Sequence, residues 1–164
     1  MVQNELLLLI SEIKESTVVL NKLNQLYTSY QSAFREETTR DLRDAVLLSD
    51  ILCNTYTCIE TILFRIARVF ENHLDPERWH KELLRKMHLE IPGIRKAVLS
   101  SESYALLDEL RRFRHFKRYY YDFDYDWAKL DYLRGIYDRL TPLIHLDLET
   151  FTNFLFECSD SLDA

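Results

Sequence analysis

Glycine and proline are nearly absent from this chain, which has 2 glycines and 3 prolines in 164 residues. Turns, bulges and hairpins use these residue types because they adopt backbone angles that other residues avoid or fix the chain in a bend. Their scarcity argues against a β-rich protein and favours long helices with few connections. It also excludes chemistry built on glycine-rich loops, because the chain has neither a P-loop nor the GxSxG turn of a hydrolase serine.

Cysteine and metal-ligand patterns are equally sparse. Cys53, Cys58 and Cys158 are odd in number and show no CxxC spacing, so we expect reduced thiols in the core and neither disulfides nor zinc ligands. The five histidines show no HExxH or related spacing. The segment DFDYD (122–126) lacks the glycine and glutamate of a calcium loop. We predict no metal and no cofactor, and we interpret Asp126 as a helix cap.

Long hydrophobic runs are missing too. The run LLLLI (6–10) lies between Glu5 and Glu12, with no basic segment or small-residue cleavage site beside it. No apolar run approaches the roughly 20 residues of a membrane span. We therefore predict a cytoplasmic protein without a membrane partner.

Hydrophobic residues recur at helical spacing along most of the chain. The pattern predicts helices over 4–33, from a cap at Thr38 or Thr39 to about 72, over 78–88, over 100–116 and over 127–161. Residues 120–126 are predicted to form a linker, and Pro142 to kink the last helix. No segment alternates long enough to be a strand. The predicted fold is all-α, a single domain (1–164) folded as an antiparallel helical bundle of four long helices plus one short helix.

Positive charge is concentrated in RRFRHFKRYYYDFDYDW (111–127), although the chain has a formal net charge of -6. Five cations and one histidine fall within 111–118, and three tyrosines follow, whereas 122–164 holds ten acids against three cations. The helix dipole favours cations near a C-terminus, which by itself explains a solvated basic helix end. Basic groups interleaved with aromatic rings are also typical of single-stranded RNA sites, where guanidinium groups bind phosphate and rings stack on bases.

Four stretches occur in a definite order: IE (59–60) before a long apolar helix, WHKELLRKM (79–87), EIPGIRKAVL (90–99) and LLDELRRFRHF (106–116). Together they closely resemble the HepT-like family of HEPN proteins. The resemblance implies an all-α homodimer encoded beside a small MntA-like nucleotidyltransferase antitoxin. It implies a metal-independent ribonuclease with an active site formed where two protomers bring their motifs together. The antitoxin of such a pair silences the ribonuclease by attaching AMP to a tyrosine.

The family's motif is an arginine, four residues, a histidine, one residue and a tyrosine. On this chain the arginine is Arg114 and the last residue is Tyr121, but Tyr119 stands at the histidine position. His115 does not restore the spacing, because only three residues separate it from Arg111. It remains a candidate stand-in, since His115 and Tyr119 would share a helical face. The resemblance makes Tyr121 the AMPylation acceptor.

The change from histidine to Tyr119 has a clear chemical direction. Metal-free RNA cleavage needs a base for the 2′-hydroxyl and an acid for the leaving oxygen. An imidazole with a pKa of about 6.5 can exchange protons at neutral pH, whereas a phenol with a pKa of about 10 is a poor base. We expect cleavage weakened by about 10²–10⁴-fold, with Arg114 still able to clamp phosphate. The remaining predicted RNA- and phosphate-binding residues are Arg111, Arg112, His115, Lys117 and Arg118.

Two further interpretations fit the same sequence. One is a catalytically inactive RNA- or nucleotide-binding bundle that still binds its nucleotidyltransferase partner. The other is a structural helical partner protein whose basic helix end is incidental. Tyr119 itself is compatible with natural divergence and with an attenuating change in a toxic ribonuclease.

Overall fold

The computed structural model describes residues 3–70, 79–119 and 124–161, and these residues form five helices. They are α1 (Gln3–Arg35), α2 (Leu42–Phe70), α3 (Trp79–His88), α4 (Ser101–Tyr119) and α5 (Trp127–Ser161). No strand occurs among the described residues, where the only bridge pairs Ile91 with Arg95. The all-α prediction, with four long helices and one short helix, is confirmed.

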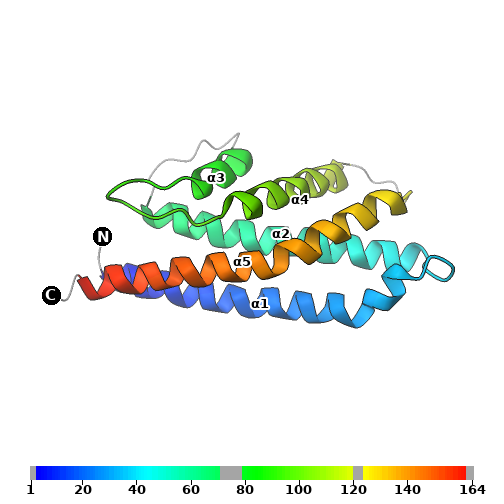
Figure 1. The fold of residues 1–164 in the computed structure, drawn as a ribbon, viewed down its shortest axis with the longest axis horizontal. Helices are drawn as coiled ribbons and strands as arrows, with labels where there is room; N and C mark the ends of the chain where they lie inside the picture. The colour runs from blue at the N-terminus through cyan, green and yellow to red at the C-terminus, as the bar shows by residue number, and fades with distance from the viewer. Residues whose placement is uncertain (1–2, 71–78, 120–123, 162–164) are drawn as a thin grey trace.

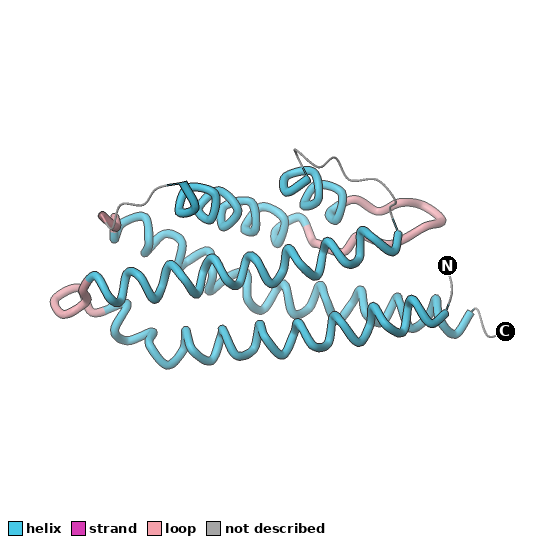
Figure 2. The backbone as a smooth tube through the Cα atoms, turned by 180° about the vertical axis from the view of Figure 1, so that it is seen from behind, coloured by secondary structure: helices cyan, strands magenta, loops and turns pink. Residues whose placement is uncertain are grey.

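Helix α2 is the centre of the bundle, in contact with all four other helices. Its fully buried side chains follow helical spacing and form a continuous apolar stripe: Leu48, Leu52, Tyr56, Ile59 and Leu63. Figure 1 shows α1 along one side of the bundle and α3 with α4 along the opposite side. The view from behind in Figure 2 shows the same arrangement, with the two termini at one end of the molecule. The bundle therefore separates the surface of α1 from the surface of α4.

The length and composition of α2 also satisfy the requirements of a membrane-spanning helix. However, 56% of its most apolar window is buried inside the bundle. A helix that is apolar on most sides and enclosed by other helices has the properties of a core element.

The start of α2 differs from the prediction, because Asp41 is its cap and neither Thr38 nor Thr39 is. The backbone N–H groups of Arg43 and Asp44 donate to Asp41 Oδ1 at 2.8 and 3.3 Å, and Asp41 N donates back to Asp44 Oδ2 at 2.9 Å. Thr38 Oγ1 instead donates to Glu36 Oε1 at 2.7 Å. Thr38 and Thr39 belong to the tight turn after α1 and therefore do not cap α2. The reciprocal hydrogen bonds of Asp41 and Asp44 satisfy backbone N–H groups at the start of α2.

The ends of α4 and α5 are partly as predicted. Asp126 caps α5 by accepting the N–H of Ala128 at 2.9 Å, which confirms that interpretation. Helix α4 extends to Tyr119, three residues beyond the predicted end at 116. Neither glycine nor proline follows Phe116 to stop it, and cations are favoured in a last helical turn. Residues 120–123 of the predicted linker lie outside the described residues, and 124–126 are not helical.

Pro142 lies inside α5, as the sequence predicted. A proline lacks the N–H that would donate to the carbonyl four residues earlier. Helix α5 changes direction along its length: its C-terminal part follows α1 and its N-terminal part rises towards α4 (Figure 1). The helix thereby contacts α1, α2 and α4.

The α3–α4 connection is fixed by a glycine and a buried arginine. Gly93 has φ 76°, in the left-handed region that other residues avoid. Arg95 is 2% exposed and donates to the carbonyl oxygens of Lys86, Leu89 and Lys96 at 2.8, 2.8 and 3.2 Å. Two of these carbonyls lie at the C-terminal end of α3, where a cation also meets the negative end of the helix dipole. The connection thereby sets the position from which α4 starts.

Candidate functional site

The predicted motif lies on the C-terminal half of α4, where that helix packs against α2. Leu107, Leu110 and Phe113 of α4 are buried in the core and hold the helix in place. Arg114 follows Phe113 and points into the same seam, where three quarters of its side chain is buried. The basic segment is therefore not simply a solvated helix end.

Arg114 is held by an acid and a ring from α2. Its Nη1 atom lies 3.5 Å from Oε2 of Glu60, and its guanidinium carbon lies 5.6 Å from the centre of the Tyr56 ring. Tyr56 in turn donates its hydroxyl to Glu60 Oε1 at 2.8 Å. Burial, followed by the charge of Glu60, raises the pKa of Tyr56 well above its usual range, so this phenol stays protonated. The guanidinium of Arg114 is therefore paired with a buried carboxylate and lies near a buried ring.

The other predicted cations lie on the same helix end, and acids accompany most of them. Arg111 Nε donates to Asp108 Oδ1 at 2.7 Å, and Arg112 contacts the other Asp108 oxygen at 2.7 Å and Glu109 at 3.3 Å. Lys117 forms an ion pair with Asp50 of α2. Five cations and four carboxylates (Asp50, Glu60, Asp108 and Glu109) leave a local net charge of +1.

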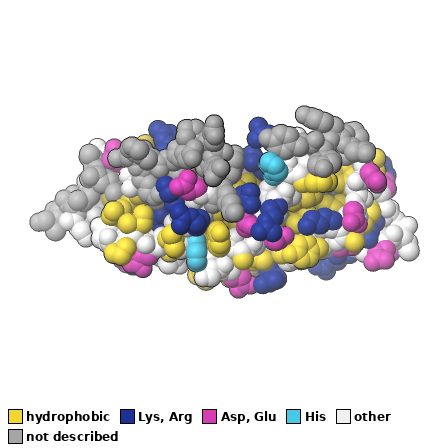
Figure 3. All heavy atoms as spheres, turned by 90° about the horizontal axis from the view of Figure 1, so that it is seen from above, with side chains coloured by type: hydrophobic (Ala, Val, Ile, Leu, Met, Phe, Trp, Pro, Cys, Tyr) yellow, Lys and Arg dark blue, Asp and Glu magenta, His cyan; other side chains and the backbone are white. Residues whose placement is uncertain are grey.

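The remaining predicted contacts, His115 and Arg118, are exposed on α4. Phe116 lies beside them on the same helix and is 54% exposed. Figure 3 looks onto the α3–α4 side and shows Lys and Arg side chains gathered there with acids among them. This surface combines cations with an exposed histidine and an exposed aromatic ring.

Cys53 lies half-buried in the α2–α4 seam, close to the charges of Lys117, Asp50 and Arg114. Burial, as the largest effect, raises the pKa of its thiol to about 11. The neutral thiol therefore dominates at physiological pH, as expected for a core-filling cysteine. All three cysteines are free thiols and are partly buried.

Tyr119 is the last residue of α4, and its backbone thus continues the helix that carries Arg114. The Tyr119 side chain and the whole of Tyr121 lie outside the described residues. Because α4 is continuous from His115 to Tyr119, the two residues are one helical turn apart, as predicted. In the described part of the chain, no three His, Cys, Asp or Glu side chains form a set that could hold a metal.

Sequence reasoning missed the contribution of α2 to this site. Glu60 was noted only as part of the IE pair, and Tyr56 and Asp50 were not singled out. The available signal was a glutamate in the middle of an apolar helical stripe, since carboxylates are rarely buried without a partner. Glu60 is 4% exposed, and its partners come from its own helix and from α4.

Comparison with known proteins gives one match. A family described as "HepT-like protein" matches residues 47–155, about two thirds of the chain. The matched range includes Glu60, Arg114 and Tyr119. Neither the curated proteins nor the solved structures that were compared include a match.

Proposed function

The chain belongs to the HepT-like family, and from this membership we propose that it is the ribonuclease toxin of a HEPN–nucleotidyltransferase pair, with cleavage weakened by Tyr119. The observation that carries the proposal is the pairing of Glu60 with Arg114 inside the matched range. A buried carboxylate that pairs with a partly exposed arginine side chain helps to pre-organise a phosphate clamp. The proposed substrate is single-stranded RNA, bound along the basic end of α4.

Arg114 has the main electrostatic role in the proposed cleavage. The 2′-hydroxyl of a ribose loses its proton to water and its oxygen forms a bond to the adjacent phosphorus, while the bond from phosphorus to the 5′-oxygen breaks and that oxygen takes up a proton. Arg114 neutralises the charge that develops on the phosphoryl oxygens, and Tyr119 is a weak acid for the leaving oxygen. The products are a cyclic phosphate and a free 5′-hydroxyl, and no metal ion takes part in the steps described.

The proposed active form is a homodimer. One helix end supplies too few groups to serve as acid, base and phosphate clamp together, whereas a twofold pairing of two α4 ends doubles them. The local charge of +1 supports only modest attraction of RNA by a single copy. Two facing copies would place the cations of both α4 ends along the phosphate backbone of one RNA.

A second candidate is an RNA- or nucleotide-binding bundle without turnover that still binds its antitoxin. It is favoured by Tyr119, because the phenol leaves the site without an effective base at neutral pH. In this case Arg114 and the exposed cations would bind RNA but not cleave it.

Cleavage of transfer RNA in the presence of EDTA distinguishes these candidates. We expect slow cleavage by the chain with Tyr119, faster cleavage by Tyr119→His and none by Arg114→Ala. Cleavage by Tyr119→His alone would support the inactive binder. If neither the chain with Tyr119 nor Tyr119→His binds or cleaves RNA, the ribonuclease and the inactive RNA binder are both contradicted. A structural partner protein would then be the remaining interpretation.

Tyr121 is the proposed AMP acceptor of the same site. A phenol beside several cations can attack the α-phosphorus of ATP, forming the tyrosine–AMP bond and releasing pyrophosphate, when an MntA-like nucleotidyltransferase supplies the metal and base. The added phosphate would occupy the basic end of α4 and exclude RNA. Incubation with that enzyme and ATP should increase the mass of the chain by one AMP.

The matched variants for this reaction are Tyr121→Phe and Tyr120→Phe. The first should abolish the mass increase, and the second should leave it intact. Modification that persists in Tyr121→Phe would place the acceptor elsewhere.

A further inference from the structure

The outer face of α1 is unusually apolar for a helix at the surface. Six of the 13 large hydrophobic side chains exposed in the described part of the chain lie on this helix, and each is between 39% and 62% exposed. They are Leu7, Leu8, Val18, Val19, Leu26 and Tyr30. The opposite face of α1 packs against α2 and α5 through Leu9, Ile13, Leu20 and Tyr27. An apolar seam along the solvent side of a long helix is typical of a surface that another helix covers.

The two charged residues within this seam are arranged symmetrically. Glu15 and Lys22 are both exposed and lie on the same outer face, two helical turns apart. The midpoint between them falls between Val18 and Val19, which are also exposed. The seam therefore carries an acid in one half and a base in the other, around an apolar centre.

We propose that α1 pairs with α1 of a second copy of this chain, antiparallel and about a twofold axis at Val18–Val19. In this register Glu15 of each copy faces Lys22 of the other. A twofold contact uses the same patch on both copies, so it forms two Glu15–Lys22 pairs. A parallel pairing would instead place Glu15 opposite Glu15 and Lys22 opposite Lys22, which like-charge repulsion disfavours.

This contact is separate from the one proposed for RNA cleavage. Helices α1 and α4 lie on opposite sides of the bundle (Figure 1), and no direct α1–α4 packing occurs among the described helices. Pairing through α1 therefore leaves the basic end of α4 uncovered and free to meet another copy. A chain that uses both contacts assembles as a dimer of dimers. The α1 contact requires neither the family's ribonuclease activity nor a particular RNA.

Charge reversal tests this contact, with sedimentation equilibrium at micromolar concentration as the readout. We expect Glu15→Lys and Lys22→Glu each to halve the assembly mass, because each creates two like-charge contacts across the twofold axis. The double variant Glu15→Lys/Lys22→Glu should regain the full mass. An equimolar mixture of the two single variants should also regain it, since each copy of one then complements a copy of the other.

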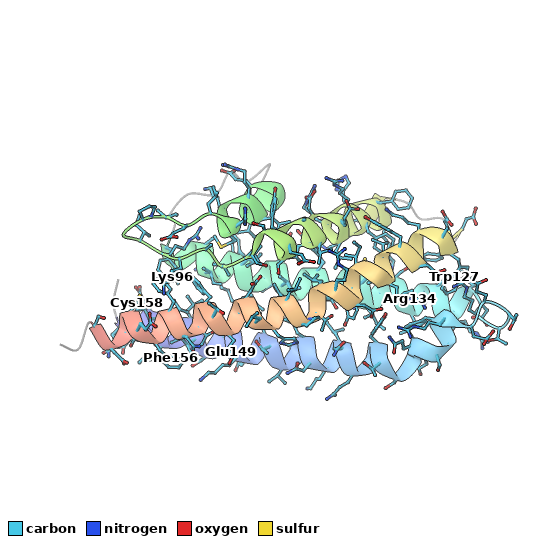
Figure 4. All side chains as sticks on the ribbon, viewed as in Figure 1. Lys96, Trp127, Arg134, Glu149, Phe156 and Cys158 are labelled. Carbon is cyan, nitrogen blue, oxygen red and sulfur yellow. The ribbon has the colours of Figure 1, made fainter. Side chains whose placement is uncertain are left out.

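The matched control is Glu149→Lys, which reverses an exposed acid on α5 (Figure 4) and leaves every residue of the α1 outer face unchanged. It should leave the mass unchanged, and circular dichroism should show that every variant keeps its helices. Failure of either single variant to lower the mass, or of the mixture to restore it, overturns the α1 contact. Loss of RNA cleavage without a change in mass would instead count against the proposed function, so the two failures are distinguishable.

Discussion

Glu60 and Arg114 illustrate how single residues in this protein combine packing with charge. Glu60 is almost fully buried, accepts the Tyr56 hydroxyl and faces the Arg114 guanidinium. A buried carboxylate needs such partners, because its desolvation is costly and only well-placed donors offset it. Arg114 is thereby kept between α2 and α4, with a quarter of its side chain exposed.

Replacing Glu60 should therefore cost more stability than replacing an exposed acid of the same seam. We expect Glu60→Gln to lower the free energy of unfolding by about 1–3 kcal/mol, because it removes a buried charge partner. Asp50→Asn is the matched change, since Asp50 pairs with Lys117 while remaining 60% exposed, and it should cost less than about 1 kcal/mol. Urea unfolding measures both values. Equal losses of unfolding free energy in the two variants would mean that the Glu60–Arg114 contact stabilises the protein no more than the exposed Asp50–Lys117 pair does.

At the scale of elements, helix position is decided by short connections. The turn before α2 places Asp41 at the helix start, and the α3–α4 connection is built around Gly93 and Arg95. Arg95 bonds three carbonyl oxygens while 2% exposed. An arginine can do this because its planar group carries five N–H donors, whereas a lysine is a single point of charge.

Arg95→Met should accordingly destabilise the chain by about 2–4 kcal/mol, because buried carbonyls lose their donors. Arg95→Lys should recover only part of that loss. Lys96→Met, an exposed change at the next residue, should stay within about 0.5 kcal/mol of the natural chain. Thermal and urea unfolding test the series, and an Arg95→Met variant as stable as Lys96→Met would show that Arg95 does not hold the connection.

For the whole molecule, hydrophobic periodicity was enough to predict the all-α bundle and, to within a few residues, its helices. Leu48, Leu52, Ile59 and Leu63 carry that signal because each must face the core of a helix that is covered on several sides. The helix ends were harder, since Thr38 and Asp41 are both good caps and the preceding turn decides between them.

The candidate site was predicted on one helix and found on two. The sequence pattern located Arg114 and its neighbouring cations on α4, with Asp108 and Glu109 one helical turn before Arg111 and Arg112, but it did not show which acids of another helix the fold would bring beside them. Asp50 and Glu60 reach this place only through the packing of α2 against α4. The concentration of charge seen in 111–118 is thus much reduced in the folded chain, from five cations to a net +1.

The most direct measurement for the proposed function is the single-turnover rate of RNA cleavage in EDTA, compared between the chain with Tyr119 and the Tyr119→His variant across pH. Tyr119→His should cleave about 10²–10⁴-fold faster near neutral pH. Its rate should fall below about pH 6.5, as the new imidazole becomes protonated and loses its capacity as a base. Adding Arg114→Ala should remove the gain. Equal rates for the two chains at every pH, or a gain that survives the loss of Arg114, would contradict a HepT-type site on α4.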